Sequence, residues 1–241
     1  MSETLLALKG VRTNIGRYHI LHGVDFVVPK SKLTVLLGRN GAGKTTTLRT
    51  IMGLWRAADG SITLDGREIA GRATPDIARL GVAYVPENMA IFADLSVREN
   101  LVLAARQGAI DQGRLQWIFG LFPALEKLWR MPAGVLSGGQ KQMLAVARAI
   151  IEPRPLILID EPTKGLAPSI VRNMIAAFRE LKQSGTTILL VEQNFMFART
   201  LGDTVAVMDD GRIVHAGTMA ALAADRALQE RLLGLSLDSH Q

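Results

Sequence analysis

One run of the 241-residue chain combines glycines, a lysine and hydroxyl groups at the spacing needed to hold phosphate. Glycines let successive backbone N–H groups point at phosphate oxygens, Lys44 can reach the β- and γ-phosphates, and the Thr45 hydroxyl can coordinate Mg²⁺. A plain glycine turn before a helix is the alternative. We expect the nucleotide-binding residues to be Gly38, Arg39, Asn40, Gly41, Ala42, Gly43, Lys44, Thr45 and Thr46.

Two consecutive carboxylates, Asp160 and Glu161, follow the apolar run 156–159. In α/β folds, ligands bind at the edge of the sheet where parallel strands have their carboxyl ends. Because side chains alternate along an extended segment, the two carboxylates should face different directions. We expect one carboxylate to hold Mg²⁺ through water and the other to act on an attacking water, although both could simply cap the next element.

A third run, Leu136-Ser137-Gly138-Gly139-Gln140, stands before a long helical pattern. Ser137 suits a helix N-cap, and two glycines at a helix start let a backbone approach an anion. A helix that is merely capped would not need both glycines, since glycine inside a helix costs about 1 kcal/mol. The run therefore indicates a second anion-binding element.

Apolar strands alternate with helical patterns around these runs, which predicts an α/β fold with an antiparallel N-terminal part. We expect strands at 33–37, 61–64, 82–85, 156–159, 186–191, 204–208 and 213–214. Helices are expected at 44–53, 96–106, 113–121, 124–129, 137–151, 169–182 and 218–233, and a frayed end at 236–241.

Since no good strand pattern occurs between residues 88 and 153, that stretch is predicted to be a helical subdomain that carries the 136–140 run. The rest, 1–87 and 154–241, is predicted to form the nucleotide-binding core with a C-terminal helical tail. Residues 1–241 would then be one cassette.

Composition excludes several classes of function. The chain has no cysteine, which excludes a disulfide framework, a thiolate zinc site and a cysteine nucleophile. Its net charge of +6 comes from scattered Lys and Arg, so no nucleic-acid partner is expected. Neither a signal peptide nor a membrane-spanning run of about 20 apolar residues is apparent, so we expect a soluble protein.

The phosphate loop, the 136–140 run and the strand ending in Asp160-Glu161 together resemble, in order and spacing, the nucleotide-binding subunit of ABC transporters. The resemblance extends from Leu5 to about residue 235. It implies a P-loop NTPase (RecA-like) parallel sheet core with an N-terminal antiparallel β part and a helical subdomain insert, and ATP and Mg²⁺ as cofactors.

The same resemblance implies a head-to-tail dimer. Each ATP would lie between the phosphate loop of one subunit and the 136–140 run, the signature, of the other. Ser137, Gly138, Gly139 and Gln140 would then bind ATP in trans.

Three details are similar to the LivF-type ATPase of branched-chain amino acid importers. Glu87 follows strand 82–85 where most family members have Gln, Ala167 stands where many have the D-loop aspartate, and Gln193 replaces a His that contacts the γ-phosphate. The resemblance implies a metal site at Thr45, Glu87 and Asp160 and catalytic roles for Glu161 and Gln193. Because Gln193 does not titrate, Glu161 is the leading candidate for the general base.

One departure from the family concerns adenine. An aromatic residue is usual near position 15, where this chain has Ile15, followed by Tyr18. Ile15 can offer apolar contact, and Tyr18 is expected to pack in the structure more than to stack on the base.

The resemblance further implies separate permease subunits, a second ATP-binding subunit (identical or related) and, indirectly, a periplasmic substrate-binding protein. The chain would work on the cytoplasmic side, peripheral to the inner face of the cell membrane. The alternatives are the ATPase of a urea or amide importer, of a lipopolysaccharide exporter, or of a non-transport ABC protein.

Overall fold

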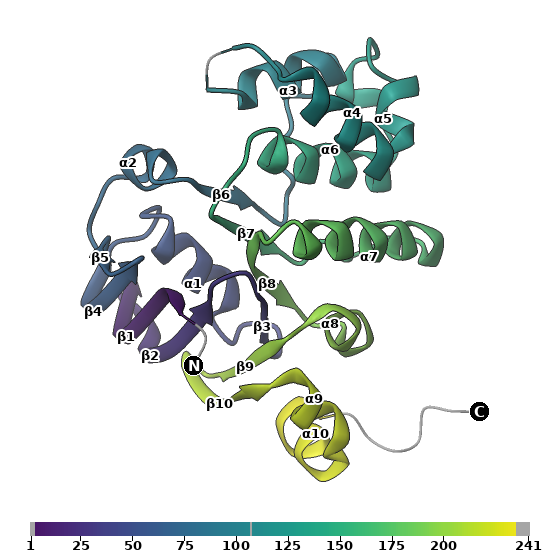
Figure 1. Cartoon of the computed structure of the whole chain (residues 1–241). Coiled ribbons are helices and arrows are strands. Elements are labelled where there is room, and N and C mark those ends of the chain that lie inside the picture. The colour runs from purple at the N-terminus through teal and green to yellow at the C-terminus, as the bar shows by residue number, and fades with distance from the viewer. Residues whose placement is uncertain (1–2, 107, 235–241) are drawn as a thin grey trace.

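The computed structural model describes residues 3–106 and 108–234; the expected frayed end, 236–241, lies outside them. Its centre is a six-stranded sheet in the order β10-β9-β3-β8-β7-β6 (Figure 1). Neighbouring strands from β9 to β6 run parallel, and β10 pairs antiparallel with β9 at one edge. The strands are β3 (Leu33–Leu37), β6 (Val82–Val85), β7 (Leu156–Asp160), β8 (Thr187–Glu192), β9 (Thr204–Asp209) and β10 (Arg212–Thr218).

A second, antiparallel sheet has the order β2-β1-β4-β5. It contains β1 (Thr4–Ile15), β2 (Tyr18–Pro29), β4 (Ala57–Leu64) and β5 (Arg67–Glu68). Strand β4 begins before the expected start at residue 61, because it continues to pair with β1 as far as the Thr13–Ala57 contact. The predicted α/β fold with an antiparallel N-terminal part is confirmed.

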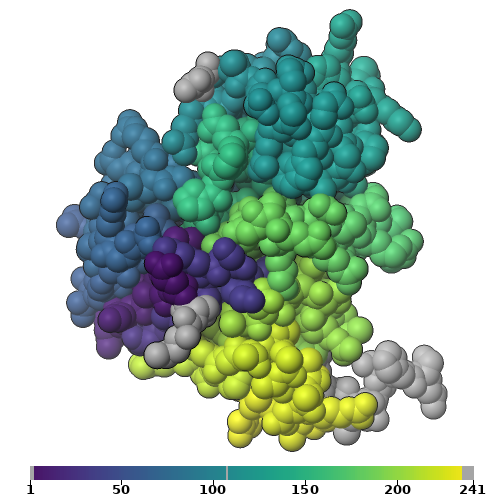
Figure 2. Space-filling view, viewed as in Figure 1, coloured from purple at the N-terminus to yellow at the C-terminus, as the bar shows by residue number. Residues whose placement is uncertain are grey.

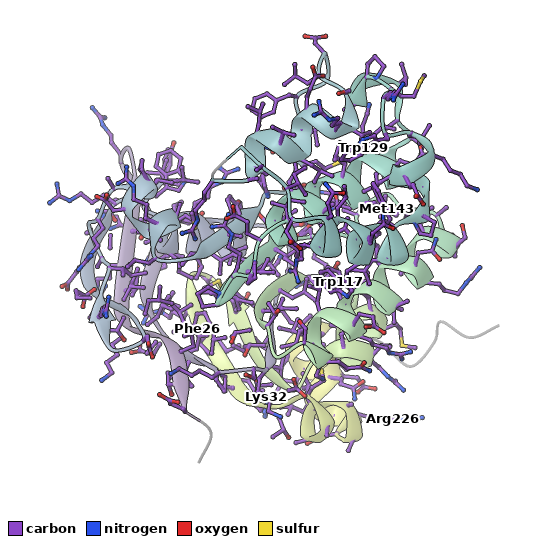
Figure 3. The ribbon with its side chains drawn as sticks, turned by 45° about the horizontal axis from the view of Figure 1, so that its top comes forward. Phe26, Lys32, Trp117, Trp129, Met143 and Arg226 are labelled. Carbon is purple, nitrogen blue, oxygen red and sulfur yellow. The ribbon has the colours of Figure 1, made fainter. Side chains whose placement is uncertain are left out.

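Helices account for the chain between β6 and β7, where no strand occurs among the described residues. This helical segment forms the upper lobe in Figure 2 and includes Met143 and Trp129, which follows one of the helices; both are labelled in Figure 3. Trp129 packs edge-on against Phe119, with ring centroids 5.3 Å apart. The elements are α3 (Val97–Ala104), α4 (Gln112–Leu121), α5 (Pro123–Lys127), a 3₁₀ turn (Ala133–Val135) and α6 (Gly138–Ile150).

The remaining helices are α1 (Lys44–Ile51), α2 (Thr74–Arg79), α7 (Pro168–Gln183), α8 (Phe195–Leu201), α9 (Met219–Ala224) and α10 (Arg226–Leu233). The expectation of a single tail helix at 218–233 is wrong, because α9 and α10 are separate helices. The Asp225 carboxylate accepts a hydrogen bond from the Leu228 N–H and starts a new helix there. In the described part of the chain, no helix is long and apolar enough to cross a bilayer.

The two faces of the central sheet bury different side chains. Val35 and Ile159 belong to a core shared with α6, α7 and α8, whereas Leu36 and Leu158 face α1 and the antiparallel sheet. This two-sided burial explains why β3, β7 and β8 are apolar along almost their entire length. The sheet edge that carries the site is therefore held from both sides.

Helices α6 and α7 approach closely at Gly139. A Cβ built there would lie 2.8 Å from Cγ2 of Ile170, whereas a Cβ at Gly138 would meet open space. Gly139 is therefore needed for helix packing, and packing gives no reason for glycine at position 138.

These two glycines give a matched pair of variants. Gly139→Ala should lower stability by about 1 kcal/mol, since overpacking of 1–3 kcal/mol outweighs the gain in helix propensity. Gly138→Ala should leave stability unchanged or slightly raised. Thermal unfolding measures both, and equal melting temperatures would contradict the close α6–α7 contact.

Candidate active site

Three catalytic loops meet because their strands are neighbours in one parallel sheet. Strand β8 lies between β3 and β7, with Leu37 opposite Glu192 and Asp160 opposite Val191. Parallel strands end at the same edge of the sheet. The phosphate loop, the Glu161 loop and the Gln193 loop therefore begin side by side.

The phosphate loop contains three positions where the backbone favours glycine. Gly41 and Gly43 have positive φ values of 81° and 107°. A Cβ at Gly38 would lie 2.3 Å from the Met208 carbonyl oxygen. Lys44 begins α1, and only 4% of its side chain is exposed.

Beside this loop is a hollow in the surface. It is lined by Ile20, Asn40, Gly41, Gly43, Lys44, Thr45, Thr46, Glu87, Glu161 and Lys164. The structure thus brings Glu87 and Glu161 together with most of the predicted phosphate loop.

Lys44 is held in place by partners within the chain. Its ammonium donates to the carbonyl oxygens of Gly38 at 2.8 Å and Arg39 at 3.0 Å, and lies 3.5 Å from Glu161 Oε1. Such a buried pair is stable only because additional hydrogen bonds satisfy the charge.

Gln193 connects the other two loops. Its side-chain Nε2 donates to Glu161 Oε1 and to Asn40 Oδ1, both at 2.6 Å. The predicted catalytic pair is therefore in direct contact, and Gln193 also reaches the phosphate loop.

Asp160 and Glu161 contact different partners, but strand alternation is not the reason. Strand β7 ends at Asp160, and Glu161 has a φ of 47°, in the left-handed region. A non-glycine residue there costs about 1–2 kcal/mol, and such strain is typical of functional sites. The expected extended geometry at Glu161 is therefore wrong, although the two carboxylates do diverge.

Asp160 is completely buried beside the phosphate loop. Thr45 Oγ1 donates to its Oδ1 at 3.1 Å, and the Tyr84 hydroxyl lies 3.4 Å from Oδ2. Burial raises the pKa of Asp160 to about 6, with Glu161 and Glu87 adding repulsion. Burial and Asp160 likewise raise the pKa of Tyr84 to about 12.

Glu87 forms an ion pair with Lys164. The Lys164 ammonium lies 2.5 Å from Glu87 Oε1 and 3.8 Å from Glu161 Oε2, and the Glu87 contact raises the pKa of Lys164. This pair connects the loop after β6 with the loop after β7.

The signature does not line this hollow. Ser137 and Gln140 form a capping box at the start of α6, each side chain accepting the other's backbone N–H. Neither Ile15 nor Tyr18 lines the hollow either. Tyr18 is 76% exposed, so the expectation that it packs is wrong.

Sequence reasoning missed Ile20, Tyr84 and Lys164. Ile20 is the apolar residue that lines the hollow, two positions beyond Tyr18. A lysine three residues after Glu161 and four after Asp160 was the signal for Lys164. Tyr84 had no comparable signal, since a tyrosine in a half-buried strand is ordinary.

The raised pKa of Asp160 gives a prediction about stability. From about pH 4 to pH 6 the folded chain retains a proton that the unfolded chain releases, so stability falls as pH rises through this range and stays lower above it. Asp160→Asn removes the penalty and should raise the free energy of unfolding at pH 8 by on the order of 2 kcal/mol. The gain should shrink toward pH 4.

Thermal unfolding from pH 4 to pH 8 measures this effect. Asp209→Asn, an exposed carboxylate at the end of β9, is the control and should show no such gain. A pH-independent difference for Asp160→Asn would refute the burial explanation.

Comparison with known proteins identifies the family. The ABC transporter family matches residues 21–164. The high-affinity branched-chain amino acid transport ATP-binding protein BraG of Pseudomonas aeruginosa is 38% identical over 232 residues, covering 95% of this chain and 100% of that protein. The probable branched-chain amino acid transport ATP-binding protein LivF of Archaeoglobus fulgidus is 34% identical over 233 residues, covering 95% and 99%.

A solved ATP-binding subunit of an ABC transporter has the same fold. It superposes with a TM-score of 0.80 at 31% identity, covering 98% of this chain and 97% of that one. The predicted P-loop NTPase architecture is confirmed. The chain belongs to the ABC transporter family, as one of its ATP-binding and ATP-hydrolysing subunits.

Proposed function

We propose that this chain hydrolyses ATP for an importer of branched-chain or other amino acids. The carrying observation is the hydrogen-bonded cluster of Asn40, Glu161 and Gln193 beside Lys44, which joins the phosphate loop to a carboxylate. The substrate class is supported by the similarity to the two branched-chain amino acid transport proteins over almost their whole length.

ATP phosphates would lie along the glycine loop. The N–H groups of residues 41–45 and the start of α1 favour negative charge there. Lys44 would exchange its carbonyl partners, Gly38 and Arg39, for phosphate oxygens. Ile15, Tyr18 and Ile20 are the candidates for adenine contact, and the position of Ile20 in the hollow favours it.

Mg²⁺ fits the donor set of this site, because Thr45, Asp160 and Glu87 offer the hydroxyl and carboxylate oxygens that it prefers. Once bound, it would neutralise charge on the phosphates. Lys164 contacts only Oε1 of Glu87, so Oε2 of this carboxylate could serve the ion.

Glu161 would accept the proton of the attacking water. Its buried carboxylate is aimed by Gln193, which can orient the γ-phosphate or the water but cannot carry the proton. The left-handed backbone at Glu161 directs the side chain toward Lys44 and away from Asp160.

A second subunit would complete the site. Ser137, Gly138, Gly139 and Gln140 lie outside the hollow of their own chain, so they could contact ATP only in another copy or in a related ATPase. Gly138, which has open space around it, offers backbone for that contact.

The chain would drive permeases through the helical subdomain, residues 88–153, which is inserted between the core segments 1–87 and 154–241. The Glu87–Lys164 pair lies at the start of that insertion and could sense nucleotide. Permeases would hold the chain at the inner face of the membrane, and a substrate-binding protein would act from the other side.

Lys44→Ala should weaken ATP binding by about 10–100-fold, the equivalent of one or two hydrogen bonds to a charged group. Equilibrium binding of ATP to the purified chain measures the loss. Lys182→Ala, which removes a lysine paired with Asp203 away from the hollow, should bind normally. Unchanged affinity in Lys44→Ala would refute the phosphate-loop assignment.

Glu161→Gln should lower kcat by about 100-fold or more while keeping ATP affinity, because proton transfer by a positioned base contributes about that much. In sedimentation experiments this variant should dimerise with ATP. Turnover near the parent rate would place the base elsewhere, and a persistent monomer would favour a heterodimer.

The transported substrate requires the assembled transporter. Its ATPase activity should rise when the binding protein carries leucine, isoleucine or valine, and remain at the basal rate when urea or short amides are supplied. The reverse result would assign the chain to an amide or urea importer.

A further inference from the structure

Glu192 is a buried carboxylate at the centre of the catalytic edge. It is the last residue of β8, lies opposite Leu37 of β3, and is only 2% exposed. No Lys, Arg or His of the described residues forms an ion pair with it, and burial raises its pKa. A carboxylate in such a place is costly unless hydrogen bonds satisfy it.

Four donors satisfy this carboxylate, and they come from two catalytic loops. Oε1 accepts the Thr163 hydroxyl at 2.6 Å and the Thr163 N–H at 3.3 Å. Oε2 accepts the N–H groups of Gln193 and Asn194, both at 3.1 Å. One side chain therefore connects the loop after β7 with the loop after β8.

These donors lie next to the reacting groups. Thr163 lies two residues after Glu161. Gln193 donates its side-chain Nε2 to Oε1 of Glu161 at 2.6 Å. The Glu161 N–H is bonded to the Val191 carbonyl at 3.0 Å, so the strained residue is held on both sides from the end of β8. Strain of this kind persists only when surrounding contacts fix it.

We propose that Glu192 is a positioning residue for ATP hydrolysis, which holds Glu161 and Gln193 in register through Thr163 and the amides of residues 193 and 194. The proposal rests on the proposed role of Glu161. Glu192 is not among the residues that line the hollow, so its removal should lower turnover while nucleotide affinity remains.

Three variants test this proposal on the purified chain. Glu192→Leu removes all four hydrogen bonds at similar volume. Glu192→Gln keeps part of the connection, since its oxygen can accept the two amides while its NH₂ donates to the Thr163 hydroxyl. Thr163→Val removes only the hydroxyl arm. Thr34→Val is the matched control, because it removes a buried hydroxyl bonded to Thr204 at 2.7 Å on strands outside the hollow.

For each variant, kcat, KM and equilibrium ATP affinity are measured at a temperature where circular dichroism shows the chain folded. Glu192→Leu should lower kcat by about 100-fold, the scale of a misplaced catalytic group, with ATP affinity within about threefold of the parent. In Glu192→Gln and in Thr163→Val, kcat should fall by about tenfold, which corresponds to the loss of one hydrogen bond. Thr34→Val should change melting temperature but not kcat.

Adding Thr163→Val to Glu192→Leu should cause little further loss, because both changes break the same connection. Parent-like kcat in folded Glu192→Gln and Thr163→Val would overturn the proposal, even if Glu192→Leu fails to fold. Equal losses of affinity and kcat would also overturn it, since they indicate general disruption. The Glu161 assignment is tested separately: it fails if Glu161→Gln turns over ATP near the parent rate.

Discussion

The active site depends on the order in which three parallel strands lie. Because β8 lies between β3 and β7, side chains from its end add contacts between the phosphate loop and the Glu161 loop to the direct Thr45–Asp160 and Lys44–Glu161 contacts. Gln193 bonds to both Asn40 and Glu161 on the solvent side, whereas Glu192, on the buried side, joins the loop after β7 to the loop after β8. Strands β3, β7 and β8 pack into two cores, which fixes the positions of their ends. The side chains of the three loops therefore lie within contact distance of one another.

Most charged side chains of the site are balanced by partners within the chain. Lys44 is balanced by carbonyl oxygens and Glu161, and Glu87 is balanced by Lys164. No ion pair with Asp160 occurs among the described residues, and burial raises its pKa to about 6, although the hydrogen bond from Thr45 offsets part of this rise. Asp160, one of the residues suited to Mg²⁺, therefore carries a burial cost within the chain, which is the trade between stability and function expected at a catalytic site.

Much of the fold and the site could be predicted from sequence, since the glycine loop, the apolar strands and the Asp160-Glu161 pair are local patterns. The left-handed turn at Glu161 could not, because strand alternation assumes an extended backbone and the strain is sustained by contacts with β8. The same holds for Glu192, whose partners are distant in sequence. The break at Asp225 was missed because a capping aspartate competes with an otherwise continuous helical pattern.

The two signature glycines look alike in the sequence, but the structure gives a packing reason for only one of them. Gly139 is required within the chain, where Ile170 leaves no room for a side chain, whereas Gly138 has open space and is exposed. Glycine has low helix propensity, so a glycine near a helix start that packing does not require destabilises the helix. Its presence indicates that a ligand or a partner approaches the backbone there. The hollow of the same chain does not include Gly138, which supports the proposal that a second subunit approaches it.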